Sequence, residues 1–234
     1  MFTPLLVAAL ALTPTPLYDS GRMKTSSCHE RVLTQGGIPH AKEYLAAVTS
    51  CLDAAWSAHL HPFSKPSVRY YEEPADRVCG VPWPSGASAF YCTTSRTLHF
   101  PLEGAWIEDR TDLYPFKVAA HEYGHHVQQV TGLRRAYERL ARATPRRAAE
   151  YNRRYELQAD CLAGVFLGSV WDSLDRSPKD WADLVDATIA SGDWGEDYRS
   201  HGRGTTRAYW LKRGYAAVSP GACDTWKAPA SKVS

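Results

Sequence analysis

The stretch AAHEYGHHVQQV, residues 119–130, decides how this chain is interpreted. It places His121 and His125 four residues apart, with Glu122 directly after the first histidine. On an α-helix, residues i and i+4 lie one above the other on the same face, about 5–6 Å apart. Two imidazoles at this spacing can hold one metal ion while the glutamate lies beside it, which is the arrangement found in zinc hydrolases.

This short pattern also occurs by chance, so it needs support from its surroundings. The helix predicted over residues 115–131 carries an apolar stripe that includes Val118, Ala119 and Val127, and it therefore faces the core. An unpaired imidazole there would be costly. Gly124 disfavours this helix by on the order of 1 kcal/mol relative to alanine, and we interpret it as room for a second helix.

A second pair of polar residues follows in the run ELQADCLAG, which begins at Glu156. Glu156 and Asp160 are again spaced i, i+4 on a predicted helix, and buried carboxylates need cationic or N–H partners. Because a catalytic zinc takes three protein ligands and a water, we expect His121, His125 and Glu156 as ligands. Asp160 would then accept the remaining N–H of a ligand imidazole. Exchange of the two carboxylate roles stays open as the less favoured assignment.

Further runs extend the pattern along the chain. HEYGHHVQQVTG from His121, ELQADCLAG from Glu156, SHGRGTTRAYWLKRGY from Ser200 and GACDTW from Gly221 together resemble the bacterial neutral zinc metallopeptidase family, a gluzincin-like group. The resemblance covers about residues 41–226, which is most of the chain.

The resemblance implies a zinc-dependent peptidase with ligands His121, His125 and Glu156. Zinc would lower the pKa of a bound water toward about 7, while Glu122, as general base, takes the water proton and passes it to the leaving nitrogen. The negative tetrahedral intermediate requires a second donor. His201 is the candidate, and a capping or solvent-facing role is an equally open interpretation.

The predicted fold class is α+β, a mainly helical zincin-like domain with a small β-sheet beside the metal cleft. Residues 1–20 are interpreted as a signal peptide, 21–40 as a flexible leader, 41–228 as the metallopeptidase domain and 229–234 as a disordered tail. Helices are predicted at 41–59, 115–131, 134–143, 147–171, 178–191 and 206–217, and strands at 67–71, 89–93 and 97–102.

The strand at 97–102 is expected beside the metal cleft, because in gluzincin-type peptidases an edge strand pairs with extended substrate. His99 on that strand is interpreted as a sheet residue. His126 lies roughly 100° around the helix from His125, so we predict that it packs or supports a ligand, and Tyr123 shares this interpretation.

The charge and the apolar segments of the sequence bear on the compartment of the protein and on its partners. The formal charge of +2 gives no support to nucleic acid as a partner, and the arginine-rich segment at 134–154 is interpreted as solvated helix faces. The apolar run at 5–12 is too short to span a bilayer, which takes roughly 20 residues, but suits a signal-peptide core. We therefore expect an extracytoplasmic protein, secreted or associated with the cell envelope, without a membrane span in its mature form.

The even set of six cysteines fits an exported disulfide-bonded protein, and no CxxC pair suggests metal ligation. Cys79 and Cys92 bracket a Gly/Pro/Ser loop that a bridge could close. Our pairing hypothesis joins these two, joins Cys161 to Cys223, and leaves Cys28 with Cys51.

Two other functions stay open beside a peptidase acting on peptide or protein substrates. The chain could be a non-catalytic binding or assembly module stabilised by its metal, in which case four protein ligands would close the metal shell. It could also be a zinc hydrolase acting on non-peptide amides. Neither substrate preference nor oligomeric state is predicted by the sequence.

Overall fold

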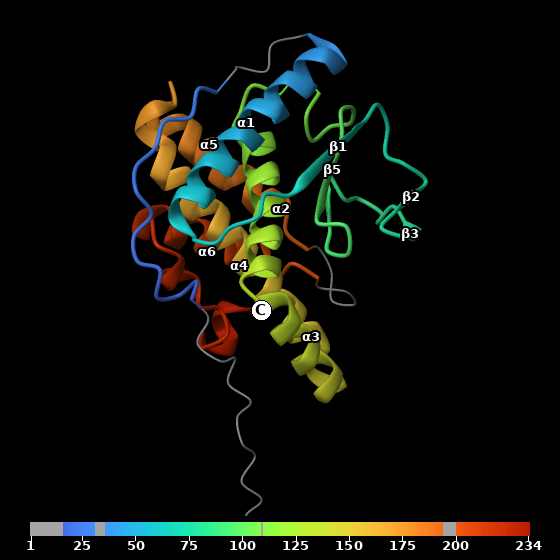
Figure 1. The fold of residues 1–234 in the computed structure, drawn as a ribbon, viewed down its shortest axis with the longest axis vertical. Helices are drawn as coiled ribbons and strands as arrows, with labels where there is room; N and C mark the ends of the chain where they lie inside the picture. Colours follow the sequence, from blue (N-terminus) through green and yellow to red (C-terminus); the bar gives the residue numbers. More distant parts are fainter. Residues whose placement is uncertain (1–15, 31–35, 109, 194–199) are drawn as a thin grey trace, which may run out of the picture.

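The computed structural model describes residues 16–30, 36–108, 110–193 and 200–234. Helices dominate this part of the chain, and a small sheet lies to one side of them (Figure 1). This is the mainly helical α+β architecture that the sequence predicts. The helices are α1 (Gly37–His59), α2 (Tyr114–Val130), α3 (Leu133–Ala143), α4 (Ala148–Val170), α5 (Pro178–Ala190) and α6 (Gly204–Ala217).

The sheet has three strands in the order β1-β5-β4. The central strand β5 (Thr97–Pro101) pairs in parallel with β1 (Ser67–Tyr71) and antiparallel with β4 (Phe90–Cys92). The prediction that the strand at 97–102 forms the edge beside the cleft is therefore wrong, because both of its sides are paired and all five of its residues are buried. The edge strand on the side of α2 is β4, whose Tyr91 hydroxyl lies 2.9 Å from His126 Nδ1.

Two shorter strands, β2 (Arg77–Val78) and β3 (Val81–Pro82), form a separate hairpin that extends away from the helices (Figure 1). The sequence analysis missed this hairpin, because strands of two residues are too short to show an alternating pattern.

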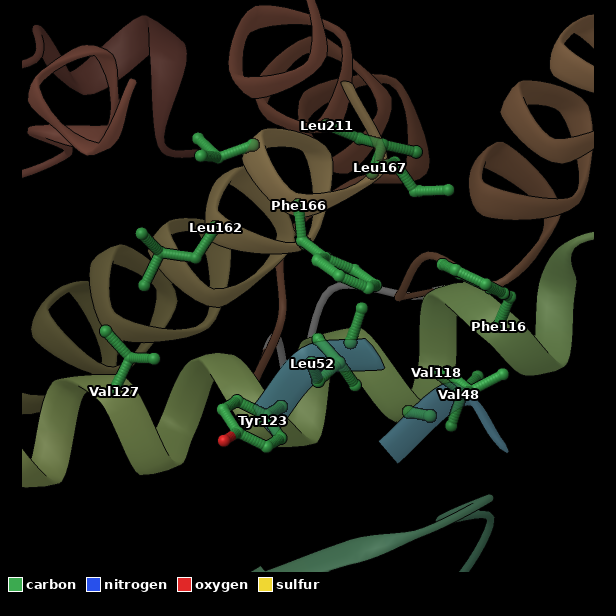
Figure 2. Close-up of a cluster of buried hydrophobic side chains, with 14 of the residues drawn as sticks. Val48, Leu52, Phe116, Val118, Tyr123, Val127, Leu162, Phe166, Leu167 and Leu211 are labelled. Atoms are coloured by element: carbon green, nitrogen blue, oxygen red, sulfur yellow. The ribbon is translucent and has the colours of Figure 1, made fainter. Parts of the chain in front are cut away.

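The hydrophobic core surrounds α2, which lies between α1 and α4 (Figure 2). Phe116 stacks against Phe166 of α4 with ring centroids 5.5 Å apart. From the other side Val48 and Leu52 of α1 approach, and both are fully buried. Since α2 is covered on several sides, few of its residues reach solvent, and its polar side chains must find partners inside the protein.

Glycines set the spacing of the helices around α2. A Cβ built on Gly124 would lie 3.1 Å from the backbone oxygen of Ala159, so the prediction that Gly124 makes room for a second helix is confirmed. The approach of α4 to α6 is closer still. A Cβ on Gly164 would lie 2.1 Å from Leu211 O, and one on Gly214 would lie 1.9 Å from Cys161 O. Side chains at these two positions would force the backbones apart.

Residues 16–30 run along the outside of the helices (Figure 1), where the sequence analysis expected the end of a signal peptide and a flexible leader. Leu17 is fully buried, Met23 is 2% exposed, and the Met23 amide donates to Val218 O at 2.8 Å. Near the end of this segment Glu30 pairs with Arg176 at 2.7 Å. A few buried anchors and backbone hydrogen bonds hold it, and such anchors leave no periodic sequence pattern. The signal-peptide core at 5–12 lies outside the described residues.

The C-terminal segment also differs from the disordered tail expected at 229–234. Val233 is 1% exposed, Trp210 Nε1 donates to Lys232 O at 2.8 Å, and Thr206 Oγ1 donates to Ser234 O at 2.9 Å. The last residues therefore lie against α6 and take part in its packing.

The cysteines form the pairs Cys28–Cys51, Cys79–Cys92 and Cys161–Cys223, which confirms the pairing hypothesis. Disulfides persist in oxidising environments, so the three bridges indicate such a compartment. None of the helices in the described ranges is long and apolar enough to cross a bilayer.

Candidate metal centre

His121 and His125 lie one turn apart on α2, with ring centroids separated by 4.8 Å. Their Nε2 atoms approach the same oxygen of α4: Glu156 Oε2 is 3.3 Å from His121 Nε2 and 3.1 Å from His125 Nε2. All three side chains are largely buried. The structure thus brings together the three residues that the sequence predicts as metal ligands, although 35 positions separate His121 from Glu156 in the sequence.

Hydrogen bonds at the other ring nitrogens assign the tautomers of both imidazoles. His121 Nδ1 lies 2.9 Å from Asp160 Oδ1, and His125 Nδ1 lies 2.9 Å from Gln128 Oε1. The amide of Gln128 is oriented by its own N–H, which donates to the carbonyl oxygen of Tyr155 at 2.8 Å. Because both partners are acceptors, each Nδ1 carries a proton, and each Nε2 is the nitrogen that faces Glu156 and is free to bind an ion once it is deprotonated.

Glu156 Oε2 is buried, and its neighbours are imidazole nitrogens, those of His121 at 3.3 Å and His125 at 3.1 Å. A buried carboxylate beside two imidazoles needs a positive charge, which either protons on the rings or a metal ion in their place can supply. The spacing fits zinc, because two ligand atoms about 2.0–2.1 Å from a tetrahedral ion lie roughly 3.3–3.4 Å apart. The observed separations of 3.1 and 3.3 Å are close to that value. The residues present therefore fit a zinc ion.

His201 reaches the same point from the segment that precedes α6. Its Nε2 lies 3.3 Å from Glu156 Oε2, and its ring centroid lies 5.9 Å from that of His121. Among the described residues, His121, Glu156 and His201 form the group whose ligand atoms all lie within 4.8 Å of one another, and this group contains His201 in place of the predicted ligand His125. His201 is more exposed than the predicted ligands, at 38% of its side chain.

The backbone around His201 is held by Asp193, whose Oδ2 accepts the amide N–H of His201 and of Gly202, both at 2.8 Å. His201 Nδ1 lies 2.7 Å from Ser200 Oγ. A hydroxyl can donate or accept, so this contact does not assign the tautomer of His201. Its Nε2 can either donate a hydrogen bond into the site or contribute a lone pair to an ion.

Asp160 binds more partners than the sequence analysis expected. Besides His121 it binds two cations, Lys117 Nζ at 2.5 Å and Arg207 Nε at 2.8 Å, and it is fully buried. Lys117 precedes His121 by four residues and therefore lies on the same face of α2. A lysine on that face is the sequence signal that could have identified this ion pair.

Electrostatic interactions shift the pKa values of several groups in this buried cluster. Burial alone would raise the pKa of both carboxyl groups, but Arg207 and Lys117 hold the pKa of Asp160 well below its usual range, and His125 and His201 do the same for Glu156. Burial lowers the pKa of Lys117 to about 8, with Arg207 acting in the same direction. Asp160 and Glu156 are therefore ionised across the neutral range.

A cavity of about 690 Å³ opens beside the cluster. Glu122, which is half-buried, lines it next to His121 and Glu156. Residues 84–90, which lead into the edge strand β4, also line this cavity. The predicted general base and two predicted ligands thus face one solvent-filled space that is large enough for part of a peptide.

The residues predicted to pack lie away from this cavity. His126 Nε2 lies 2.6 Å from Ser64 O, and the Tyr123 hydroxyl donates to Asp53 at 2.7 Å. His99 lies on the central strand, where its Nδ1 is 2.7 Å from the Tyr71 hydroxyl. His126 and Tyr123 therefore tie α2 to its neighbours, and His99 is a sheet residue as predicted.

Comparison with known proteins gives one family. The family described as "Putative neutral zinc metallopeptidase" matches residues 39–226. The uncharacterized protein Rv2575 of Mycobacterium tuberculosis is 30% identical over 210 residues, which cover 79% of this chain and 70% of that protein. The uncharacterized protein YpfJ of Escherichia coli K12 is 28% identical over 210 residues, covering 80% of this chain and 71% of that protein. No solved structure matches. With its match spanning most of the sequence and its paired histidines meeting Glu156, this chain belongs to the neutral zinc metallopeptidase family.

Proposed function

We propose that this protein is a zinc-dependent peptidase that hydrolyses peptide bonds in the cavity beside Glu122. The observation that carries the proposal is the buried Glu156 oxygen, which lies 3.3 and 3.1 Å from the Nε2 atoms of His121 and His125. This donor set of two histidines and one glutamate is a recurring catalytic zinc site, and it leaves a coordination position for water.

His121, His125 and Glu156 would hold the ion, and Asp160 would keep the His121 ring in the tautomer that binds it. When bound, zinc polarises the scissile carbonyl and lowers the pKa of water toward about 7. Glu122 takes the proton from the attacking water and delivers it to the leaving nitrogen. In this proposal His201 Nε2 donates a hydrogen bond to the oxygen that becomes negative in the tetrahedral intermediate.

The edge of β4 supports an extended peptide as the substrate. Ser88, Ala89 and Phe90 line the cavity, and β4 pairs within the sheet only with β5. An extended chain could add to that edge as a further strand, so that main-chain hydrogen bonds hold it whatever its side chains are. A substrate bound in this way would pass close to Glu122.

The proposal predicts different results for two substitutions. Glu122→Gln keeps the ligands and should retain zinc while hydrolysis falls at least a hundredfold. His121→Ala removes a ligand and should lose both zinc and hydrolysis. Cleavage of a mixed peptide library, with and without chelator, and the zinc content of each purified variant are the measurements. Full activity in Glu122→Gln would show that another group acts as the base.

The position of His201 favours one alternative function. If its Nε2 is a fourth ligand, the metal shell is closed and the protein is a binding or assembly module with a structural metal. For His201→Ala, our proposal predicts unchanged zinc content and lower turnover, because only the intermediate loses a donor. Loss of zinc from this variant would instead identify His201 as a ligand. Chelator-sensitive cleavage of small amides, with peptides left intact, would point to a non-peptide hydrolase.

We also propose that the protein acts outside the cytoplasm, secreted or associated with the cell envelope. The three disulfides support this, because such bridges do not persist under reducing conditions. Fractionation of the producing cells, followed by thiol labelling of the protein from each fraction, tests the proposal.

A further inference from the structure

A buried network of hydrogen bonds leads from His125 away from the metal centre to the N-terminal segment. Gln128, whose oxygen faces His125, is joined to Gln158 of α4, and Gln158 is joined to Tyr18. We call these four residues the His125 network. Both glutamine side chains are fully buried. Since Tyr18 lies outside residues 39–226, which the family matches, the family match does not supply this connection.

The direction of each hydrogen bond in the network is fixed. Gln128 Nε2 donates to Tyr155 O at 2.8 Å and to Gln158 Oε1 at 2.9 Å. Gln158 Nε2 donates to the Tyr18 hydroxyl at 2.6 Å and to Cys223 O at 3.0 Å. An amide nitrogen carries two N–H groups, so each glutamine uses both of them. Only the oxygen of Gln128 is left for the imidazole.

Two backbone carbonyls, Tyr155 O and Cys223 O, set this direction because a carbonyl oxygen can only accept. If the amide of Gln158 were turned over, its oxygen would face Cys223 O and its nitrogen would face the nitrogen of Gln128. Buried polar groups that lose their partners in this way cost about 1–3 kcal/mol each. The direction at one end of the network therefore determines that His125 presents an Nδ1–H at the other end.

The side chain beside His125 has to be an amide. Gln128 accepts from the imidazole and at the same time donates to Tyr155 O. A carboxylate has no N–H and could not do both, although a carboxylate, Asp160, is sufficient beside His121. The support of His125 thus depends on donor groups that the rest of the network holds in place.

The ring face of His125 is constrained as well. Tyr155 stacks on it with ring centroids 4.8 Å apart and an interplanar angle of 15°. Stacking restricts the plane of the imidazole, and the contact with Gln128 decides where each nitrogen lies within that plane. Together they direct Nε2 to Glu156 Oε2, 3.1 Å away. Without the contact to Gln128 the ring could rotate, and weaker metal binding would follow.

The N-terminal end of the network is held by its own contacts. Leu17, directly before Tyr18, is fully buried. Ser219 Oγ donates to Gly21 O at 2.9 Å, which ties the segment at residues 16–30 to the turn before Cys223. The Tyr18 hydroxyl is therefore an acceptor with a defined position.

We propose that Gln158 is a positioning residue of the metal centre, which acts through Gln128 to hold His125 in the orientation and tautomer that bind zinc. Tyr18 completes this support, so that zinc affinity depends on an N-terminal segment that contributes no ligand. The inference rests on the proposed function in one respect, since it takes the site to hold zinc. It does not depend on which bond the protein hydrolyses.

The experiment measures the dissociation constant of zinc by competition with a chromophoric chelator, and the visible spectrum of the cobalt-substituted protein. Gln158→Met keeps the length of the side chain and removes its polar atoms. It should raise the dissociation constant about tenfold, as for residues that support a ligand, and change the cobalt bands. An unchanged dissociation constant overturns the inference. Weaker binding with an unchanged cobalt spectrum would show general destabilisation and overturns it too.

Tyr18→Phe is the milder variant, and it decides the question even if Gln158→Met does not fold. It removes only the hydroxyl and should raise the dissociation constant about threefold, since one hydrogen bond is lost at the far end of the network. The matched control is Tyr44→Phe, because the Tyr44 hydroxyl also binds the N-terminal segment, donating to Glu30 at 2.7 Å. The control should leave zinc affinity unchanged. Equal effects of the two substitutions overturn the inference.

Combining Tyr18→Phe with Gln158→Met tests whether the two residues act in series. If Tyr18 acts only through Gln158, the double variant should bind zinc no more weakly than Gln158→Met alone. Additive losses would show that each residue stabilises the protein separately, and they overturn the inference.

The N-terminus of the protein isolated from its producing cells gives another test. Removal of residues 1–20 would take Tyr18 away, so the inference predicts that any processing of an export signal leaves Leu17 and Tyr18 in place. Mass spectrometry of the intact protein measures this. A mature chain that begins after Tyr18 overturns the inference.

Two results would separate this inference from the peptidase proposal. Zinc binding with the expected variant effects, but without cleavage of any peptide, would leave the His125 network and remove the peptidase. Chelator-sensitive peptide cleavage by a protein whose variants all bind zinc like the wild type would leave the peptidase and remove the inference. A wild-type protein that binds no zinc would overturn both.

Discussion

Asp160 shows how a single buried residue organises this site. It accepts hydrogen bonds from a predicted ligand, His121, and from Lys117 and Arg207. Two cations on one carboxylate leave this point with an excess positive charge, balanced by Glu156 and Glu122 nearby. The sequence spacing predicted the contact with His121. The two cations could not be predicted, because α6 brings Arg207 from 47 positions away and nothing in the local pattern indicates that approach.

The buried lysine leads to a prediction about pH. The pKa of Lys117 is lowered from 10.5 to about 8, mainly by burial. Between these values the unfolded chain binds more protons at this lysine than the folded protein, so its contribution makes stability rise with pH. In urea unfolding of the metal-free protein, the wild type should gain on the order of 1 kcal/mol more than Lys117→Met between pH 8 and pH 9.5.

The substitution Lys117→Met removes the titrating group while Asp160 keeps its bonds to Arg207 and His121. Other groups that titrate in this range are common to both proteins and cancel in the comparison. Equal pH slopes for the two proteins would show that Lys117 keeps an ordinary pKa in the folded state.

At the scale of elements, the packing of α4 on α6 depends on Gly164 and Gly214. Helix propensity alone would make Gly214→Ala stabilising by about 1 kcal/mol. The structure predicts the opposite, because the new Cβ would lie 1.9 Å from Cys161 O and no flexible side chain is there to move away. We expect a loss of at least 3 kcal/mol in the free energy of unfolding, by analogy with overpacked cores.

The control for this substitution is Lys212→Ala on the exposed side of the same helix, which should change stability by less than about 0.5 kcal/mol. Chemical denaturation of both variants provides the measurement. A Gly214→Ala protein as stable as the wild type would mean that the two helices can separate without cost.

Most helix boundaries predicted from the sequence agree with the structure to within a few residues. α5 begins where Ser177 and Pro178 predict, and there Ser177 forms a capping box with Asp180. Caps and apolar stripes are local, so a sequence shows them directly. Strand order is not local. The position of β5 at the centre of the sheet depends on β1, which lies about 30 residues earlier, and no pattern within residues 97–102 indicates it.

The residues of the candidate site also fall into two groups: those that a local sequence pattern indicates and those whose position depends on the tertiary structure. The i, i+4 spacing of His121 and His125 predicted their proximity, and the buried position of Glu156 followed from the stripe of its helix. The approach of His201 and the wall of the cavity beside Glu122 depend on loops, whose course a single sequence does not determine. Residues 84–88 illustrate this, since they were interpreted as part of a Gly/Pro/Ser loop and line the cavity beside Glu122.

At the scale of the whole molecule, the bridge Cys161–Cys223 closes the longest of the three disulfide loops, with a sequence separation of 62. Its removal by Cys161→Ala and Cys223→Ala should cost about 4 kcal/mol, because the unfolded chain gains loop entropy. The same pair of substitutions at Cys79 and Cys92, with a separation of 13, should cost about 3 kcal/mol. Thermal or denaturant unfolding of the two double variants tests this order, and a reversed order would contradict it.

Cys161 follows Asp160 directly in α4, and its bridge anchors the C-terminal segment beside the proposed metal ligands. We therefore expect oxidation of this cysteine pair to favour the position of α4 that the proposed metal site requires. Under the proposed function, a newly made chain with reduced thiols would bind zinc more weakly than the oxidised protein. The disulfide would then make zinc binding depend on the redox state of the compartment, in addition to stabilising the fold.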